Sequence, residues 1–125
     1  MTVIVHIKRA YEASADGDGF RVLVDRLWPR GLSKATLKYD KWYKELAPSS
    51  ELRKWFGHQP ERWEGFRRDY TAELQSEQAQ ALMGEILDEA QGRVITLVYG
   101  AHDPEHNQAV VLSGVLAAYA KRHRS

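Results

Sequence analysis

The segment from Val94 to Tyr99 is almost continuously apolar, and Gly100 follows it directly. A short apolar run rich in β-branched residues is typical of a strand that is buried on both faces. Such strands belong mainly to parallel sheets, because an antiparallel strand with one wet face alternates apolar and polar residues. This run therefore favours an α/β fold over an all-helical or all-β fold.

Two further segments are predicted to be strands. Residues 2–8 place Val3, Val5 and Ile7 on one face, and residues 20–25 follow the Asp-Gly-Asp-Gly turn signal at 16–19. Only eleven residues, 9–19, separate the two strands. That length is close to the lower limit for a parallel crossover, so a hairpin between these strands is the competing topology.

The remainder of the chain has mainly helical periodicity, and its helices are predicted from residues with known positional preferences. These are a helix capped by Ser49 or Ser50, a helical region from Pro60, a continuation over Ala79–Ala90 that stops at Gly92, and a last helix with Asp103 as N-cap and Pro104 in its first turn. A length of 125 residues suits one core. We therefore expect a single α/β domain over residues 1–125, with a small, mainly parallel β-sheet flanked by helices.

Composition excludes several classes of function. The chain has no cysteine, which excludes disulfides, thiolate catalysis and cysteine-ligated metals. Eighteen basic residues stand against seventeen acidic ones, so no overall field attracts nucleic acid or a membrane surface. No apolar run is long enough to span a bilayer, and the first residues lack the features of a signal peptide. We expect a cytoplasmic protein without a membrane partner.

Charge is distributed unevenly along this nearly neutral chain. Residues 21–58 carry nine Lys or Arg and four acids, a balance of +5, whereas residues 61–90 carry three Arg and eight acids, a balance of −5. One interpretation is two solvated helix faces of opposite sign. The other is a basic site in the first half, supported by an acidic second half.

The most distinctive loop is Asp-Arg-Leu-Trp-Pro-Arg-Gly at 25–31, directly after the second predicted strand. Asp25 can orient Arg26 through a charge-assisted hydrogen bond, and arginine presents a planar fork to carboxylates and phosphates. Pro29 and Gly31 shape a rigid turn. The loop therefore predicts anion recognition by Arg26 and Arg30. The structural alternative is an internal Asp25–Arg26 ion pair with Trp28 in the core.

Ligands of open parallel sheets bind beyond the carboxyl ends of the strands. If the strands are parallel, six side chains converge there: Lys8, Arg9, Arg26, Arg30, Tyr99 and His102. The predicted helix start at Asp103 adds an anion site, at which His102 or Tyr99 would handle protons.

Metal and cofactor motifs are weak or missing. His102 and His106 have a spacing that suits a metal on one helix, but Asp103-Pro104 separates them and no third ligand is evident. The sequence contains no G-x-G-x-x-G, Walker A, H-E-x-x-H or G-x-S-x-G motif. We expect neither a metal nor a cofactor.

Aromatic residues interleave with basic ones in the middle of the chain. Such a pattern can stack single-stranded nucleic acid, although at helical spacing the aromatics are more often core. A nucleic-acid-binding module is therefore an alternative function, and a protein-interaction or homodimer unit using exposed aromatics is another. The aromatics are Trp42, Tyr43, Trp55, Phe56 and Trp63, among Lys41, Lys44, Arg53, Lys54 and Arg62.

Three strings resemble the DUF488 family, in its short YeaO-like branch. They are residues 25–31, residues 42–49 with 52–56, and Tyr99-Gly100-Ala101 followed by Asn107, Ala109, Val111 and Leu112. The resemblance runs from about Val3 to Leu116. It implies an α/β domain, which favours the parallel arrangement, with residues 9–19 as the shortened remnant of a helix that joins the first two strands in longer relatives. It also implies site roles for the residues that match: Asp25, Arg26, Trp28, Arg30, Tyr99 and Asn107.

The leading hypothesis is an anion-recognising pocket for a phosphorylated or carboxylated small molecule or a nucleotide. In it Arg26 and Arg30 hold the anion, with Trp28, Lys8, Arg9 and Asn107 as further binding residues. Asp25, Tyr99 and His102 are the candidates for proton transfer, and whether a reaction occurs is left open.

Overall fold

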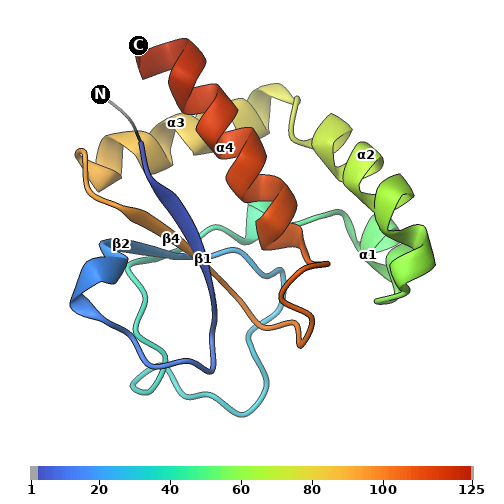
Figure 1. The fold of residues 1–125 in the computed structure, drawn as a ribbon, viewed down its shortest axis with the longest axis horizontal. Helices are drawn as coiled ribbons and strands as arrows, with labels where there is room; N and C mark the ends of the chain where they lie inside the picture. Colours follow the sequence, from blue (N-terminus) through green and yellow to red (C-terminus); the bar gives the residue numbers. More distant parts are fainter. Residues whose placement is uncertain (1–2, 125) are drawn as a thin grey trace.

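The computed structural model describes residues 3–124. Helices pack beside a small central sheet, and the end of the last helix lies near the start of the first strand (Figure 1). In chain order the elements are β1 (Val5–Arg9), η1 (Asp16–Asp18), β2 (Phe20–Leu23), β3 (Lys41–Trp42), η2 (Lys44–Leu46), α1 (Ser50–Phe56), η3 (Pro60–Arg62), α2 (Trp63–Glu73), α3 (Glu77–Ala90), β4 (Ile95–Tyr99) and α4 (Gln108–Arg124), where η marks a 3₁₀ turn.

The strands form one sheet in the order β1-β4-β2-β3 over the described residues, and every pairing is parallel. The expected parallel α/β fold is confirmed. Because β4 lies between β1 and β2, the alternative hairpin is wrong. The ten residues that join these strands, 10–19, cross β4 with only the short turn η1, since a two-strand step needs little chain when no helix is inserted.

Helices cover one face of the sheet. Alternate residues of β2 and β4 point to that face and join side chains of α1, α2, α3 and α4 in one core. Val5 and Ile7 of β1 pack against the same core, as the alternation predicts. β4 is buried throughout, as expected of a strand with a neighbour on each side and cover on both faces.

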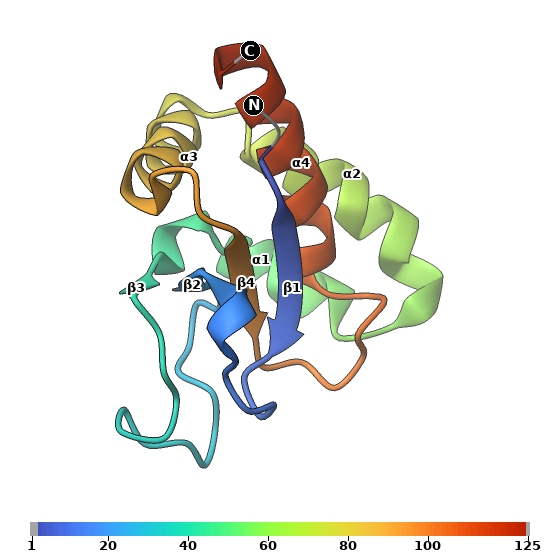
Figure 2. The ribbon, with the colours of Figure 1, turned by 60° about the vertical axis from the view of Figure 1, so that its left-hand side comes forward.

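Loops cover the opposite face. Leu23 and Val98 pack there against Ala10 and Leu37, which belong to the connections that follow β1 and β2. In Figure 2 the long connection between β2 and β3 lies on the other side of β4 from α4 and α2. The fold therefore has a helical layer and a loop layer, with the sheet between them.

Several boundaries differ from the predicted ones. β2 ends at Leu23 and β1 begins at Val5, while Thr2, the predicted start, lies outside the described residues. Ser49 is the cap of α1, where its hydroxyl accepts a hydrogen bond from the Leu52 N–H at 3.2 Å. β3 was not predicted, because a two-residue strand has no readable period.

The start of α4 is the largest error of the sequence prediction. The helix begins at Gln108 and not beside Asp103. Asn107 is its cap, since its Oδ1 accepts hydrogen bonds from the N–H groups of Ala109 at 2.9 Å and Val110 at 3.2 Å. The Asp103 side chain instead accepts from the N–H groups of Glu105 and His106, which makes a turn that precedes the helix.

None of the helices in residues 3–124 combines the length and the apolar character needed to cross a membrane.

Candidate functional site

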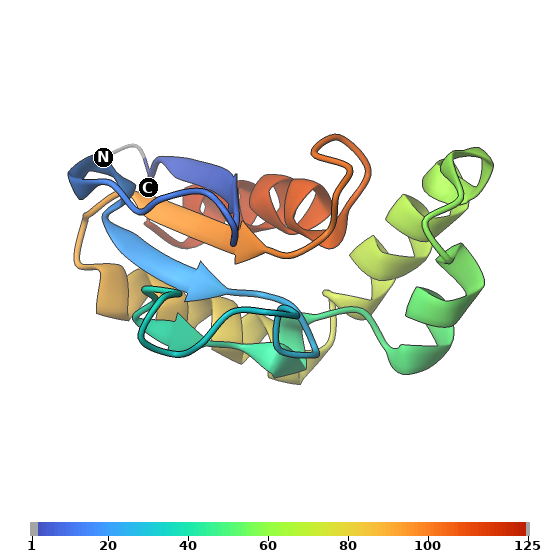
Figure 3. The same ribbon diagram turned by 90° about the horizontal axis from the view of Figure 1, so that it is seen from below.

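A cleft of about 1040 Å³ lies at the carboxyl ends of the strands. Its lining includes Asp25, two residues beyond the end of β2, and Gly100, directly after β4, and α1 and α2 supply a wall. In Figure 3 the arrowheads of β2 and β4 point toward α1 and α2, which stand beyond the sheet. The site thus lies where a parallel sheet places its ligands.

Asp25 is partly buried and both of its carboxylate oxygens accept hydrogen bonds. Oδ2 accepts from the Gly100 N–H at 2.9 Å, and Oδ1 accepts from Gln108 Nε2. Burial raises the pKa of Asp25 to about 6, and the bonds from Gly100 and Gln108 counter that rise only in part. The carboxylate is thus poised to change its charge close to neutral pH.

The expected Asp25–Arg26 pair does not form. Arg26 donates from Nε to the Pro48 carbonyl at 3.1 Å and from Nη2 to the Ala47 carbonyl at 3.3 Å. Consecutive side chains diverge where the strand ends, so the two groups have different partners. Arg26 still lines the cleft, where it fastens the segment before α1 to the loop after β2.

Arginines dominate the charged lining of the cleft. Arg9 donates from Nε to the Ala101 carbonyl at 2.9 Å, and its guanidinium lies over the Tyr11 ring, while its other side-chain N–H groups have no hydrogen-bond partner in the described part of the chain. Arg30 and Arg53 are exposed, and their guanidinium groups have no hydrogen bond or ion pair within residues 3–124. Together with Arg26 they make four arginines against two aspartates, Asp25 and Asp103.

Trp28 lines the cleft and also serves the loop-side core. Its ring packs edge-on against Tyr39 and Trp42, with centroids 5.5 and 5.6 Å away, and its Nε1 donates to the Leu32 carbonyl at 2.6 Å. Gly31, at φ 84°, lets the chain turn back to make that bond. Trp28 therefore fixes the loop shape that was predicted, with part of its surface in the cleft.

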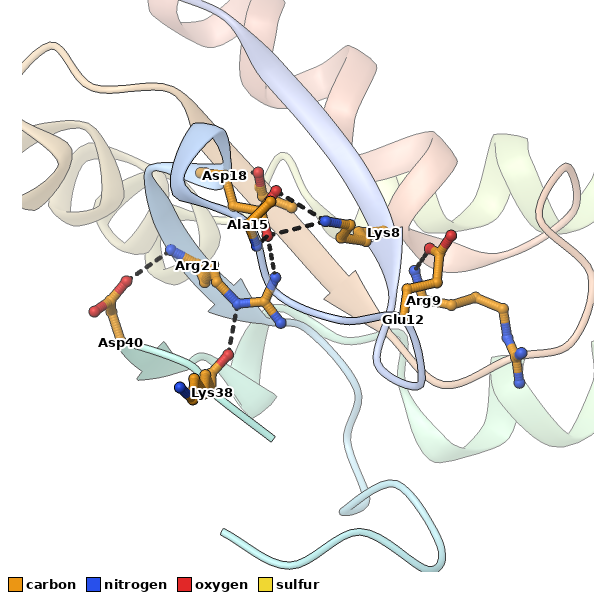
Figure 4. A network of polar contacts seen from close by, with 9 residues as sticks. Lys8, Arg9, Glu12, Ala15, Asp18, Arg21, Lys38 and Asp40 are labelled. Atoms are coloured by element: carbon orange, nitrogen blue, oxygen red, sulfur yellow. Dashed lines mark hydrogen bonds and ion pairs between the residues drawn. The ribbon is translucent and has the colours of Figure 1, made fainter. Parts of the chain in front are cut away.

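Two predicted site residues lie elsewhere. Lys8 points to the loop-covered face, where its Nζ is 3.1 Å from Asp18 Oδ1, because neighbours in a strand point to opposite faces (Figure 4). Tyr99 is only 2% exposed and belongs to the helix-side core. Burial raises the pKa of Tyr99, as do nearby Glu12 and Asp103, while Arg9 and Asn107 oppose the rise, so its phenol stays protonated at neutral pH.

The loop from β4 to α4 contributes differently from what was expected. His102 is exposed and lines the cleft. Asn107 lines it too, but its side chain is engaged in capping α4, so the helix N-terminus has fewer free N–H groups for a ligand. His106 bonds through Nδ1 to Asp103 at 2.9 Å and precedes the helix, so the two histidines do not share a helical face. Residues 3–124 bring together no cluster of three or more metal-ligating side chains.

Several lining residues were not among the predicted site residues. Gln108, the first residue of α4, holds Asp25, and Phe56 and Phe66 form an apolar wall in which their rings stack at 4.5 Å. Tyr11 donates to the Arg30 carbonyl at 2.7 Å and so ties the Asp25–Gly31 loop to the segment after β1. The sequence singled out Arg53 and Phe56 only in the family string at 52–56 and in the aromatic and basic pattern, since no sequence signal places α1 at the sheet edge.

The aromatic residues behind the nucleic-acid alternative are mostly interior. Tyr43 and Phe56 are buried, and Trp63 stacks on Phe66 at 5.7 Å. Trp55 is 43% exposed, and the Arg62 guanidinium lies over its ring. The structure therefore presents few open rings on which bases can stack.

Known proteins resemble this chain over most of its length. A family model described as "Inactive DUF488-N3 subclade" matches residues 4–125. The uncharacterised protein YeaO of Escherichia coli (strain K12) is 43% identical over 110 residues, which are 87% of this chain and 93% of YeaO. The uncharacterised protein Rv3073c of Mycobacterium tuberculosis (strain H37Rv) is 38% identical over 112 residues, 90% of this chain and 92% of its own. No solved structure matches the chain.

Proposed function

This chain belongs to the DUF488 family, and from that premise and the cleft geometry we propose that it binds a phosphorylated or carboxylated small molecule. The observation that carries the proposal is the lining of one cleft by Arg9, Arg26, Arg30 and Arg53. Guanidinium groups match the geometry of carboxylates and phosphates and stay charged at any physiological pH. The site would be the carboxyl edge of the sheet.

The two carboxylates in the cleft leave this positive character in place. Asp25 is held by the neutral donors Gly100 and Gln108, and Asp103 by its own turn and His106. Neither forms an ion pair with an arginine among the described residues. Neither carboxylate of the cleft therefore offsets the positive charge of the guanidinium groups, which remains available to an anionic ligand.

Binding without turnover is the form of this function that we favour. The matching family model describes its subclade as inactive. Tyr99, the phenol predicted to move protons, is buried in the core and protonated at neutral pH. The apolar wall of Phe56 and Phe66 suits a ligand that has a carbon framework beside its anion.

Calorimetric titration with inorganic phosphate, citrate and AMP tests the proposal on the whole chain. We expect at least one probe to bind, with affinity about tenfold weaker in Arg30→Ala or Arg53→Ala, equal to ~1.4 kcal/mol. Arg122→Ala is the matched control. It removes an exposed arginine of α4 that lies about 21 Å along the helix from Gln108, at 1.5 Å per residue.

The two kinds of variant separate a site from a general charge effect. Equal losses in Arg30→Ala and Arg122→Ala would show attraction by net charge alone. Failure of all three anions to bind the wild-type chain would overturn the proposed function.

A further inference from the structure

Asp25 is an acidic group in a cleft lined by arginines, yet it is paired with none of them. A partly buried carboxylate without a cation loses hydration energy that neutral hydrogen bonds restore only in part. Its elevated pKa records that cost. A costly, unpaired group facing a cleft is a candidate for contact with a ligand.

The carboxylate is held rigidly in place. Gly100 and Gln108 each donate to one oxygen, and Trp42 Nε1 donates to the Asp25 backbone carbonyl at 2.6 Å. A Cβ on residue 100 would come within 2.8 Å of Asp25 Oδ2, so glycine permits this close approach. Asp25 therefore has a fixed orientation before any ligand arrives.

Each oxygen of Asp25 keeps acceptor capacity. An ionised carboxylate accepts more hydrogen bonds than the two supplied here, and it can donate none. A second anion is repelled at this position, whereas a hydroxyl group fits it, because an O–H···O⁻ bond is short and charge-assisted. The arginines that line the cleft are positively charged donors, so they suit the anionic group of the same ligand.

We propose that Asp25 reads a hydroxyl group on the bound anion, so that the ligand is a hydroxylated phosphate or carboxylate such as a sugar phosphate or a hydroxy acid. This inference rests on the proposed function of the cleft. In it the arginines hold the anionic group and Asp25 accepts a hydrogen bond from a hydroxyl elsewhere on the molecule. Asp25 thereby sets specificity, and the arginines supply attraction.

Matched ligand pairs test the inference. Glycerol 3-phosphate is compared with n-propyl phosphate, and malate with succinate, by calorimetry on the wild-type chain and on Asp25→Asn. We expect the hydroxylated member to bind about five- to tenfold more tightly to the wild type, equal to ~1–1.4 kcal/mol, because only this member donates a hydrogen bond to the charged carboxylate. In Asp25→Asn the preference for the hydroxylated member falls below about twofold. The member without a hydroxyl group binds to this variant at least as tightly as to the wild type, since a negative charge has gone.

The variant should keep its fold, because rotation of the Gln108 amide lets Gln108 accept from the new Asn amide while Gly100 still donates to the Asn oxygen. A second measurement uses the native side chain. The pKa of Asp25, followed by carboxyl-carbon NMR, should fall when glycerol 3-phosphate binds and rise when n-propyl phosphate binds. A hydroxyl donor stabilises the charged form, whereas a bare anion disfavours it.

The outcomes are distinguishable. If neither member of any pair binds, the proposed function fails and this inference with it. If both members bind with equal affinity, or move the Asp25 pKa in the same direction, the cleft binds anions but Asp25 does not read a hydroxyl. A preference for 3-aminopropyl phosphate without any for glycerol 3-phosphate would replace the hydroxyl with an ammonium group and overturn the inference.

Discussion

Asp18 and Asp25 are both removed from water in large part, yet their surroundings differ completely. Asp18, on the loop-covered face, contacts Lys8 Nζ at 3.1 Å and Arg21 Nη1 at 2.5 Å, and it accepts from the Ala15 N–H at 3.0 Å (Figure 4). Asp25, at the cleft, has only neutral donors among the residues that the structure describes. The same residue type is paired in one region and left without a counter-charge in the other.

The difference appears directly in the two pKa values. Burial raises the pKa of Asp18, but the bonds from Ala15, Lys8 and Arg21 outweigh it, so that pKa lies below the ordinary value of 3.8. Burial dominates at Asp25 and raises its pKa to about 6. A closed ion cluster is typical of structure, and an open carboxylate in a cleft is typical of function.

Asp18→Ala should have the largest effect on stability. It leaves Arg21, whose side chain is 7% exposed, without a counter-charge, and breaking a buried pair costs about 3–5 kcal/mol. The free energy of unfolding from urea melts measures this loss. Asp69→Ala, which breaks the exposed pair with Arg68, is the control and should change stability by less than ~1 kcal/mol. Similar losses of stability in the two variants would mean that the ion cluster of Lys8, Asp18 and Arg21 does not stabilise the fold.

The pH dependence of stability should have opposite signs at the two aspartates. The lowered pKa of Asp18 gives stability that is present above about 3.8 and is lost as the pH falls further. The raised pKa of Asp25 means that the folded chain binds a proton more tightly than the unfolded chain, so its contribution to stability declines as the pH rises from about 4 to about 6.

Asp25→Asn isolates the second effect. Relative to wild type, the variant should gain on the order of 1 to 1.5 kcal/mol between pH 4.5 and pH 7.5, from a pKa shift of about two units that is only partly complete in this window and is discounted for partial exposure. His58, His102 and Asp103 also line the cleft, but they are present in both proteins and cancel in the difference. Urea melts at the two pH values measure it, and a constant difference would contradict the raised pKa.

The sheet was predictable because its strands have distinct patterns. The apolar run of β4 identified the central strand, and the alternation of Val3, Val5 and Ile7 identified the core face of β1. The position of α4 was not predictable, because Asp103 and Asn107 are both good caps and only the tertiary structure chooses between them. Local signals thus defined the elements better than their ends.

The position of the cleft was predictable from the sequence, but the hydrogen-bond partners of its residues were not. Arg9, Arg26 and Arg30 do line one cleft, as the carboxyl-edge rule requires. The predicted partner of Asp25, its neighbour Arg26, was wrong. The side chain that bonds to Asp25 belongs to Gln108, which lies 83 residues away in the chain. Lys8 was misplaced for a simpler reason, since strand alternation sends it to Asp18. Long-range hydrogen bonds leave no local signal.

Two glycine substitutions, one beside Asp25 and one at an open position of α4, test whether the close approach of Gly100 holds the Asp25 carboxylate in place. Gly100→Ala places a methyl group 2.8 Å from Asp25 Oδ2, so the carboxylate must shift and the bond from residue 100 weakens, at a cost of about 1–2 kcal/mol. Gly114→Ala on α4 meets open space and should stabilise the chain by about 0.5–1 kcal/mol through helix propensity. Thermal and urea melts measure both changes. Only Gly100→Ala should also move the Asp25 carboxyl resonance, because only that methyl reaches the cleft; a variant that leaves the resonance unmoved would show that Asp25 is not held by the close approach of Gly100.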